Sequence, residues 1–373
     1  MGTFRLLLAV FVVIAHTQGY TSNFKIDLGV IAVSVFFFIS GYLMPLAFES
    51  KYQFSSFVKR VKNYAINRFL RIYPAYWVSL ILYLVISRFH QNAITKESLS
   101  HVSTYLQNLL LIGLNQSHLW GGYFRFNNPA WSLDVELQYY ILVPLLLLGW
   151  HRKRNITVPI LIIASLASAY LLWSSTHIVD IDRSLLAWSL VFFAGFLFYK
   201  SSKTQALFRK VVPPIIAFSL CMIIAILSRE LRTVAFTTAL ISVAGHLLVL
   251  QKERRFGRFD AKLGDLSYPV YVFHIFVVAK TFSFISKYYA PLDASPTLHF
   301  SFLALANIVA TLIAAYMITV VLVYPIERLR KKRKAETSID GFKIEPYELV
   351  KPTIVETTNH ASIENSLTPD KRN

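Results

Sequence analysis

Ten long apolar runs are the feature that most constrains the fold of this chain. Of its 373 residues, 55% are hydrophobic and only 16% are charged, a balance that excludes an ordinary soluble domain of this length. Runs that can cross a bilayer as helices are found at 4–17, 30–48, 72–89, 137–150, 156–173, 184–199, 211–228, 232–250, 269–286 and 301–324. The first and the fourth are short unless polar residues extend them. The sequence therefore predicts an all-α polytopic membrane protein with about ten transmembrane helices, and both termini on one side.

The basic residues alternate between the loops, and this asymmetry orients the chain. Lys and Arg gather in every second connection, at 49–71, 152–154, 200–210 and 252–262, and again after residue 327, whereas the intervening loops hold few. By the positive-inside rule, both termini are then cytoplasmic. The same rule accounts for the net charge of +18 without a nucleic-acid partner, since no motif that reads DNA or RNA occurs.

The connections between the runs differ in character. Residues 49–71 are basic with recurring apolar positions, which predicts an amphipathic interfacial helix. The connection 89–134 is long and expected to be external, and within it His101–Leu114 is apolar but too short to span. After residue 334 the chain is polar and contains scattered prolines, which favours disorder. We therefore expect a membrane domain over 1–334 and a disordered cytoplasmic tail over 335–373.

No metal site is expected from the sequence. The single cysteine, Cys221, lies in an apolar run, which excludes an intrachain disulfide and a cysteine-based metal cluster. The histidines at 101, 118, 246 and 299 lack the spacing of metal ligands.

An arginine and a histidine interrupt the first apolar run. Arg5 and His16 are eleven residues apart, which on a helix comes to about 20° past three full turns and roughly 16 Å along the axis. The two side chains therefore lie on one face of the helix. Because ionisable groups in a span are costly, they usually face the protein interior or a wet cavity. The pair predicts a polar path through the membrane, although an arginine near a helix end also snorkels to the interface.

Three further stretches place polar side chains on one helical face each. They are Ser132, Glu136 and Tyr140 at i, i+4 and i+8; Ser267, Tyr271 and His274 at i, i+4 and i+7; and Arg68 and Arg71 at i and i+3. Glu136 is the carboxylate best placed to enter a span among aromatic residues. Pro74 is expected in the first turn of the third span, where its missing N–H costs little.

Five motifs follow one another along the chain. They are Arg5 with ten residues to His16, the phenylalanine-rich 33–42, Arg68–Trp77, Trp131–Glu136 and Ser267–His274. In this order, and with ten predicted spans, the chain resembles the integral-membrane acyltransferase family 3, the bacterial O-acyltransferases of surface polysaccharides. The resemblance extends from Arg5 to about Arg328. It departs at 32–34, where Ala-Val-Ser stands in place of the Gly-Val-Asp that is frequent in the family, so the role of that aspartate is not carried over.

The resemblance implies transfer of an acyl group, usually acetyl, from cytoplasmic acyl-CoA to a hydroxyl of a surface polysaccharide or its lipid-linked precursor (O-antigen, capsule or exopolysaccharide), in the bacterial inner membrane. Acyl-CoA is then a donor substrate, and no bound cofactor is expected. His16 is the candidate general base, and we hypothesise that Glu136 holds its imidazole in the active tautomer. The other candidates are Arg5, Arg68 and Arg71 for the CoA phosphates, and Ser267, Tyr268, Tyr271 and His274 for substrate or oxyanion support.

Two other classes of function stay open at this stage. A secondary transporter or flippase for a glycan or small metabolite also has many spans with ionisable residues, although the chain shows no internal repeat. A non-catalytic membrane partner in polysaccharide assembly is the third class. Arg68 and Arg71 are also explained as positive-inside charges, and the tyrosines as interface residues. The oligomeric state is not determined by the sequence.

Overall fold

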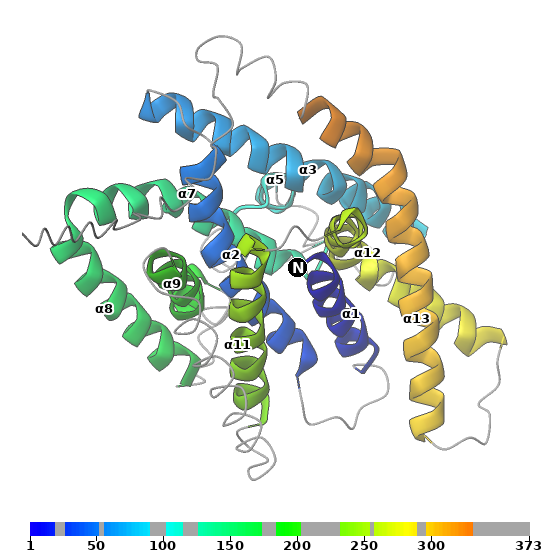
Figure 1. Cartoon of the computed structure of the whole chain (residues 1–373). Coiled ribbons are helices and arrows are strands. Elements are labelled where there is room, and N and C mark those ends of the chain that lie inside the picture. Colours follow the sequence, from blue (N-terminus) through cyan, green and yellow to red (C-terminus); the bar gives the residue numbers. More distant parts are fainter. Residues whose placement is uncertain are drawn as a thin grey trace, which may run out of the picture. The chain divides into compact units, whose positions relative to one another are not determined.

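A computed structural model describes residues 1–18, 27–51, 56–89, 102–114, 126–173, 184–202, 232–253, 257–288 and 296–330. These residues form helices and turns, and no β-strand occurs among them (Figure 1). The helices are α1 (Gly2–Gln18), α2 (Leu28–Lys51), α3 (Phe57–Phe89), α5 (Val102–Leu110), α7 (Ala130–Arg152), α8 (Arg154–Trp173), α9 (Leu185–Ser202), α11 (Arg232–Glu253), α12 (Arg258–Tyr288) and α13 (Pro296–Ile318), which continues into a π-helical turn at Thr319–Val323. The prediction of an all-α fold is confirmed for this part of the chain.

Several of these helices are long and apolar enough to cross a membrane. By length and composition, five qualify among the described residues: Leu28–Lys51, Ala130–Arg152, Thr233–Leu250, Phe259–Ile285 and Leu298–Arg330. Three shorter apolar helices lie at Gly2–Thr17, Arg154–Ser168 and Leu185–Ser201. The run 211–228 and the whole of the expected tail 335–373 lie outside the described residues. The count of ten spans, the side of the termini and the tail's disorder therefore stay predictions.

Helix α3 differs from what the sequence predicted. The basic stretch 57–71 is not a separate interfacial helix, because it continues without a break into the apolar run 72–89 as one helix of 33 residues. Pro74 lies in the interior of this helix and not in a first turn. A proline inside a helix removes one backbone hydrogen bond, and membrane helices tolerate this loss where neighbouring groups satisfy the freed carbonyl.

Part of the long connection 89–134 is folded against α3 and α7. Helix α5 ends where Leu111 and Gly113 adopt positive φ angles of 54° and 72°. Its last carbonyls accept hydrogen bonds from aromatic side chains of α3: Tyr76 Oη to Asn108 at 2.7 Å, Trp77 Nε1 to Leu109 at 3.0 Å and Tyr73 Oη to Leu110 at 2.6 Å. Beyond the helix end, the Leu114 N–H donates to Asp134 Oδ2 of α7 at 2.8 Å. The carbonyls that a helix end leaves unpaired are thus satisfied by α3.

Residues 1–328 form one compact unit in which α1 and α2 take the inner positions. Helix α1 packs against α12, α2 and α13, while α2 packs against α9 and α11 (Figure 1). Where α2 and α9 cross, a Cβ on Gly41 would lie 2.3 Å from the Phe192 carbonyl oxygen, and one on Gly195 would lie 2.2 Å from that of Phe38. Glycine at both positions lets the two backbones touch, as small residues do between membrane helices.

Candidate active site

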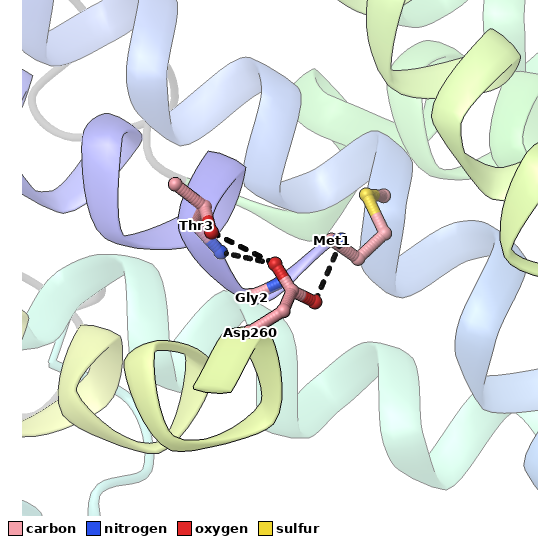
Figure 2. A network of polar contacts seen from close by, with 4 residues as sticks. All are labelled: Met1, Gly2, Thr3 and Asp260. Carbon is pink, nitrogen blue, oxygen red and sulfur yellow. Dashed lines mark hydrogen bonds and ion pairs between the residues drawn. The ribbon is translucent and has the colours of Figure 1, made fainter. Parts of the chain in front are cut away.

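The N-terminal end of α1 is anchored to α12 by one carboxylate (Figure 2). Asp260 accepts hydrogen bonds from the amino group of Met1 at 3.0 Å, from Gly2 N and Thr3 N at 2.9 Å each, and from Thr3 Oγ1 at 2.8 Å. A negative group at a helix N-terminus satisfies unpaired N–H groups and interacts favourably with the helix dipole. Because Asp260 belongs to another helix, it also fixes the register of Arg5 and His16 against α12.

At the other end of α1, His16 meets His274 of α12. The two rings are T-shaped with centroids 4.7 Å apart, and His16 Nδ1 lies 3.2 Å from His274 Nε2. His16 Nδ1 also lies 2.9 Å from the Val12 carbonyl oxygen, and His274 Nδ1 lies 2.6 Å from that of Tyr271. His274 is fully buried, whereas His16 is partly exposed.

These contacts determine which nitrogen of each neutral ring carries the proton. A carbonyl oxygen only accepts, so Nδ1 of both histidines must donate. His274 Nε2 is then an acceptor, and the His16 Nδ1–H is shared between it and the Val12 carbonyl. His16 Nε2 is left unprotonated and makes no hydrogen bond to any described residue. A neutral imidazole with a free Nε2 is what a general base requires.

A cavity with about 640 Å³ of empty space lies among α1, α2, α3, α7 and α12; we call it the arginine cavity. Arg5, Arg71 and Glu136 line it, together with Ser132 and Tyr140 of the predicted stripe on α7. Within the described part of the chain, neither Arg5 nor Arg71 forms an ion pair at 4 Å or less. Two guanidinium groups that face a cavity without a paired carboxylate indicate an anionic ligand.

Glu136 takes partners other than the one hypothesised from the sequence. Its Oε1 accepts hydrogen bonds from Ser40 Oγ at 2.6 Å and from Tyr140 Oη at 2.5 Å. No hydrogen bond joins Glu136 to His16, whose ring is held by Val12 and His274. The hypothesis that Glu136 sets the tautomer of His16 is therefore wrong for this arrangement, and Glu136 belongs to the wall of the arginine cavity.

The α12 residues expected to support substrate or oxyanion lie in two different places. Ser267, Tyr268 and Tyr271 line the arginine cavity, while His274 contacts His16. Their hydroxyls donate to backbone carbonyls: Ser267 to Gly264 at 2.7 Å, Tyr268 to Ile72 at 2.7 Å and Tyr271 to Pro129 at 3.0 Å. Tyr271 Oη also lies 2.5 Å from Ser132 Oγ. In this state these hydroxyl protons are already used, so none points to an oxyanion.

Arg68 does not join the other two arginines. Its guanidinium lies over the rings of Tyr64 and Tyr140, at 5.5 and 5.8 Å from their centroids, and Nη1 lies 3.3 Å from Met44 Sδ. The residue is 6% exposed and does not line the arginine cavity. Arg68 therefore supports the wall behind Tyr140, and its expected contact with CoA phosphates stays a prediction.

A second cavity, with about 960 Å³ of empty space, opens beside His16; we call it the histidine cavity. Asp27, Trp131 and Trp188 are among its described lining residues. Val33 and Tyr271 line both cavities. The polar path predicted from α1 is thus two cavities that meet at one partition, with Arg5 on one side and His16 on the other.

Some residues of this arrangement were not singled out from the sequence. Ser40, the partner of Glu136, lies inside the phenylalanine-rich motif and is a polar residue in an apolar run, which is a usable signal. Asp27 stands directly before α2, and its Oδ1 accepts from Val30 N at 2.9 Å as an N-cap, a pattern that the sequence shows. Trp188 carries no signal of its own, because a tryptophan in a span is ordinary packing.

Comparisons with known proteins place the chain in a family. A model of the acyltransferase domain family, acyltransferase 3, matches residues 2–323. An uncharacterized protein of Haemophilus influenzae is 31% identical over 39% of this chain and 60% of its own length. The peptidoglycan O-acetyltransferase OatA of Listeria monocytogenes is 30% identical over 43% of this chain and 26% of its own length. The acyltransferase MdmB of Streptomyces mycarofaciens is 33% identical over 34% of this chain and 29% of its own length. The chain thus spans less than two thirds of these relatives.

No solved structure matches the chain significantly. The family match covers all five motifs and the residues that line both cavities. The chain belongs to the integral-membrane acyltransferase family 3.

Proposed function

We propose that this acyltransferase is an O-acetyltransferase of the bacterial inner membrane. It moves an acetyl group from cytoplasmic acetyl-CoA to a hydroxyl of a cell-surface polysaccharide or its lipid-linked precursor, such as O-antigen, capsule or exopolysaccharide. The name of one relative, a peptidoglycan O-acetyltransferase, supports both the acetyl group and a cell-envelope glycan. Both termini are assigned to the cytoplasm by the loop charges, which puts Arg5 on the donor side and His16 on the acceptor side.

One observation carries the proposal: two arginines that form no ion pair with a described residue line a cavity, and this cavity adjoins a histidine whose Nε2 bonds to no described residue. The phosphates of CoA are multiply charged and match guanidinium groups, which bind phosphate in a bidentate way. We assign Arg5 and Arg71 to this contact. The thioester then reaches the partition at Val33 and Tyr271, and the hydroxyl approaches from the His16 side.

The reaction follows from this assignment. His16 Nε2 takes the proton of the acceptor hydroxyl while the hydroxyl oxygen forms a bond to the thioester carbon. The tetrahedral oxyanion collapses, the carbon–sulfur bond breaks, and the CoA thiolate takes the proton back from the imidazolium. The products are an O-acetyl sugar and free CoA, and the histidine returns to its starting state. Transfer of the acetyl group through an unidentified carrier group stays an alternative.

His274 is a positioning residue in this scheme. It does not line either cavity and is fully buried, but its Nε2 accepts from the Nδ1–H of His16. This hydrogen bond, together with the Val12 carbonyl, keeps the proton on Nδ1 and stabilises the imidazolium that forms during the reaction. The role that a carboxylate has in many catalytic triads falls here to a carbonyl and a second histidine.

The test is acetylation by the purified protein in detergent or liposomes. Acetyl-CoA and the glycan fraction of the producing cell are supplied, and free CoA thiol and the acetyl mass increment on the glycan are measured together. We expect wild-type protein to produce both and His16→Ala to lose about 10²–10⁴-fold in rate. His246→Ala, a histidine of α11 that lines neither cavity, is the matched control. His16→Ala with the wild-type rate would refute the proposal.

A further inference from the structure

We propose that the acyl group of the donor binds at the partition between the two cavities and that Val33 limits this group to acetyl. The acyl chain packs against Val33 and Phe36 of α2, beside the ring of Tyr271 of α12. The inference rests on the proposed function, and it adds which residues determine the length of the transferred acyl group.

The partition lies where the reacting carbon must be. Val33 and Tyr271 line both cavities, so their side chains face the donor on one side and the acceptor on the other. In the proposed reaction, the thioester sulfur comes from the arginine cavity and the attacking hydroxyl oxygen from the histidine cavity. The tetrahedral carbon has two further substituents, the oxyanion and the acyl chain. Because both cavities are already taken, these two substituents point at the walls of the partition.

The wall formed by α2 suits the acyl chain rather than the oxyanion. Val33 and Phe36 are three residues apart, so they share one face of the helix, and both line the arginine cavity. Their side chains offer no hydrogen-bond donor, whereas a developing oxyanion requires donors. A methyl group, by contrast, is stabilised by contact with apolar side chains. We therefore place the acyl chain against Val33 and Phe36.

The partition is held in place, as a pocket that selects by size requires. Val33 is 6% exposed, and a β-branched side chain in a helix has one strongly preferred rotamer. The Tyr271 hydroxyl donates to the Pro129 carbonyl oxygen at 3.0 Å and lies 2.5 Å from Ser132 Oγ. The ring of Phe36 packs edge-on against that of Tyr271, with centroids 6.3 Å apart. Against such fixed walls, one extra methylene in the substrate costs about 10–200-fold in kcat/KM, so a propionyl group is disfavoured.

Donors of increasing length test the inference in the full-length protein in detergent, with the glycan fraction of the producing cell as acceptor. The measured quantity is kcat/KM of acyl transfer from acetyl-, propionyl- and butyryl-CoA. For wild-type protein we expect this value to be lower for propionyl-CoA than for acetyl-CoA by a factor of about 10 or more, and lower again for butyryl-CoA. Val33→Ala removes the branched methyl groups, and we expect it to raise the ratio of propionyl to acetyl transfer about tenfold. A wild-type protein that transfers butyryl as fast as acetyl, or a Val33→Ala protein with the wild-type ratio, would overturn the inference.

Matched variants separate the partition from a general loosening of the fold. Val35→Ala is the same substitution on the same helix, at a fully buried residue that lines neither cavity, and we expect it to keep the wild-type ratio. If its ratio rises as much as that of Val33→Ala, the inference fails. Phe36→Leu shortens the same wall and tests it if Val33→Ala does not fold; a raised ratio supports the inference, and an unchanged ratio contradicts it. Because each ratio compares two donors on one preparation, an inactive fraction of the protein does not alter it.

Donor binding without glycan distinguishes this inference from the proposed function. By calorimetry, we expect Val33→Ala to gain affinity for butyryl-CoA relative to acetyl-CoA, whereas Val35→Ala does not. If this gain is found but wild-type protein transfers no acyl group to the glycan, the proposed function fails and the acyl site stands. If wild-type protein acetylates the glycan but Val33→Ala changes neither the rate ratio nor the affinity ratio, the acyl group binds elsewhere and the proposed function stands.

Discussion

Replacing His274 separates a positioning role from a catalytic one. The residue lies beside His16 but offers no free nitrogen: Nδ1 donates to Tyr271 O and Nε2 accepts from His16. Its contribution to the reaction is then about one hydrogen bond. A net value of about 0.5–1.5 kcal/mol for such a bond corresponds to a rate loss of about 2- to 13-fold, far below the about 10²–10⁴-fold expected for loss of the base.

Two amides test which of the two contacts of His274 matters. In His274→Gln the amide lies near the former Nε2, so its oxygen still accepts from His16 Nδ1–H. In His274→Asn the amide lies near the former Nδ1, so it still donates to Tyr271 O but does not reach His16. We expect the glutamine variant to retain more activity than the asparagine variant, although both are similarly buried and polar.

The assay is the initial rate of acetyl transfer at saturating acetyl-CoA, with thermal unfolding in detergent as the control for folding. The rates of the glutamine and asparagine variants are compared on condition that the two variants unfold at the same temperature. The rate of His16→Ala is measured in the same assay. If His274→Gln loses as much rate as His16→Ala, His274 is itself the base and the assignment of roles is reversed. If the asparagine variant is as active as the glutamine variant, the contact with His16 does not matter for the reaction.

Two further predictions concern the packing that positions the site. Asp260→Ala removes the acceptor of three hydrogen bonds from Gly2 and Thr3. We expect this variant to unfold at a lower temperature and to bind acetyl-CoA more weakly, because Arg5 is displaced. Unchanged acetyl-CoA binding would show that this anchor does not position Arg5. Gly195→Ala places a Cβ 2.2 Å from the Phe38 carbonyl oxygen and is expected to cost about 1–3 kcal/mol of folding stability. In the control Gly245→Ala, the new Cβ meets only the Phe198 ring, at 3.3 Å. Equal unfolding temperatures of these two variants would contradict the close contact between α2 and α9.

Much of the candidate site was predictable because helical spacing determines which residues share a face. Ser132, Glu136 and Tyr140 were placed on one stripe by their i, i+4, i+8 spacing, and all three line the arginine cavity. Spacing within one helix does not determine which side chains of other helices lie opposite. The sequence therefore suggested that Glu136 serves His16, whereas its hydrogen bonds join it to Ser40 and Tyr140.

The sequence also predicted the fold class and left the boundaries of some elements to tertiary packing. Apolar runs predicted most of the described helices, because burying backbone polar groups in lipid requires helices. The stretch 57–71 was separated from 72–89 by its change in composition, yet the backbone hydrogen bonds continue across it as α3. The composition of a helix follows the polarity of its environment, and this polarity changes along a helix that extends beyond the hydrocarbon core of the membrane.

By itself, the sequence determined a helical membrane protein with an arginine and a histidine on one face of its first helix, and five motifs that mark its family. Only the tertiary structure decided that this face is divided between two cavities by Val33 and Tyr271. It also decided that His274, and not Glu136, holds His16. The physical reason is that hydrophobic periodicity fixes the direction of a side chain around its own helix, while its partners depend on how helices cross. Those crossings are set by contacts between residues far apart in the chain. Examples are the hydrogen bonds from the start of α1 to Asp260 of α12, and the approach of Gly41 to Gly195.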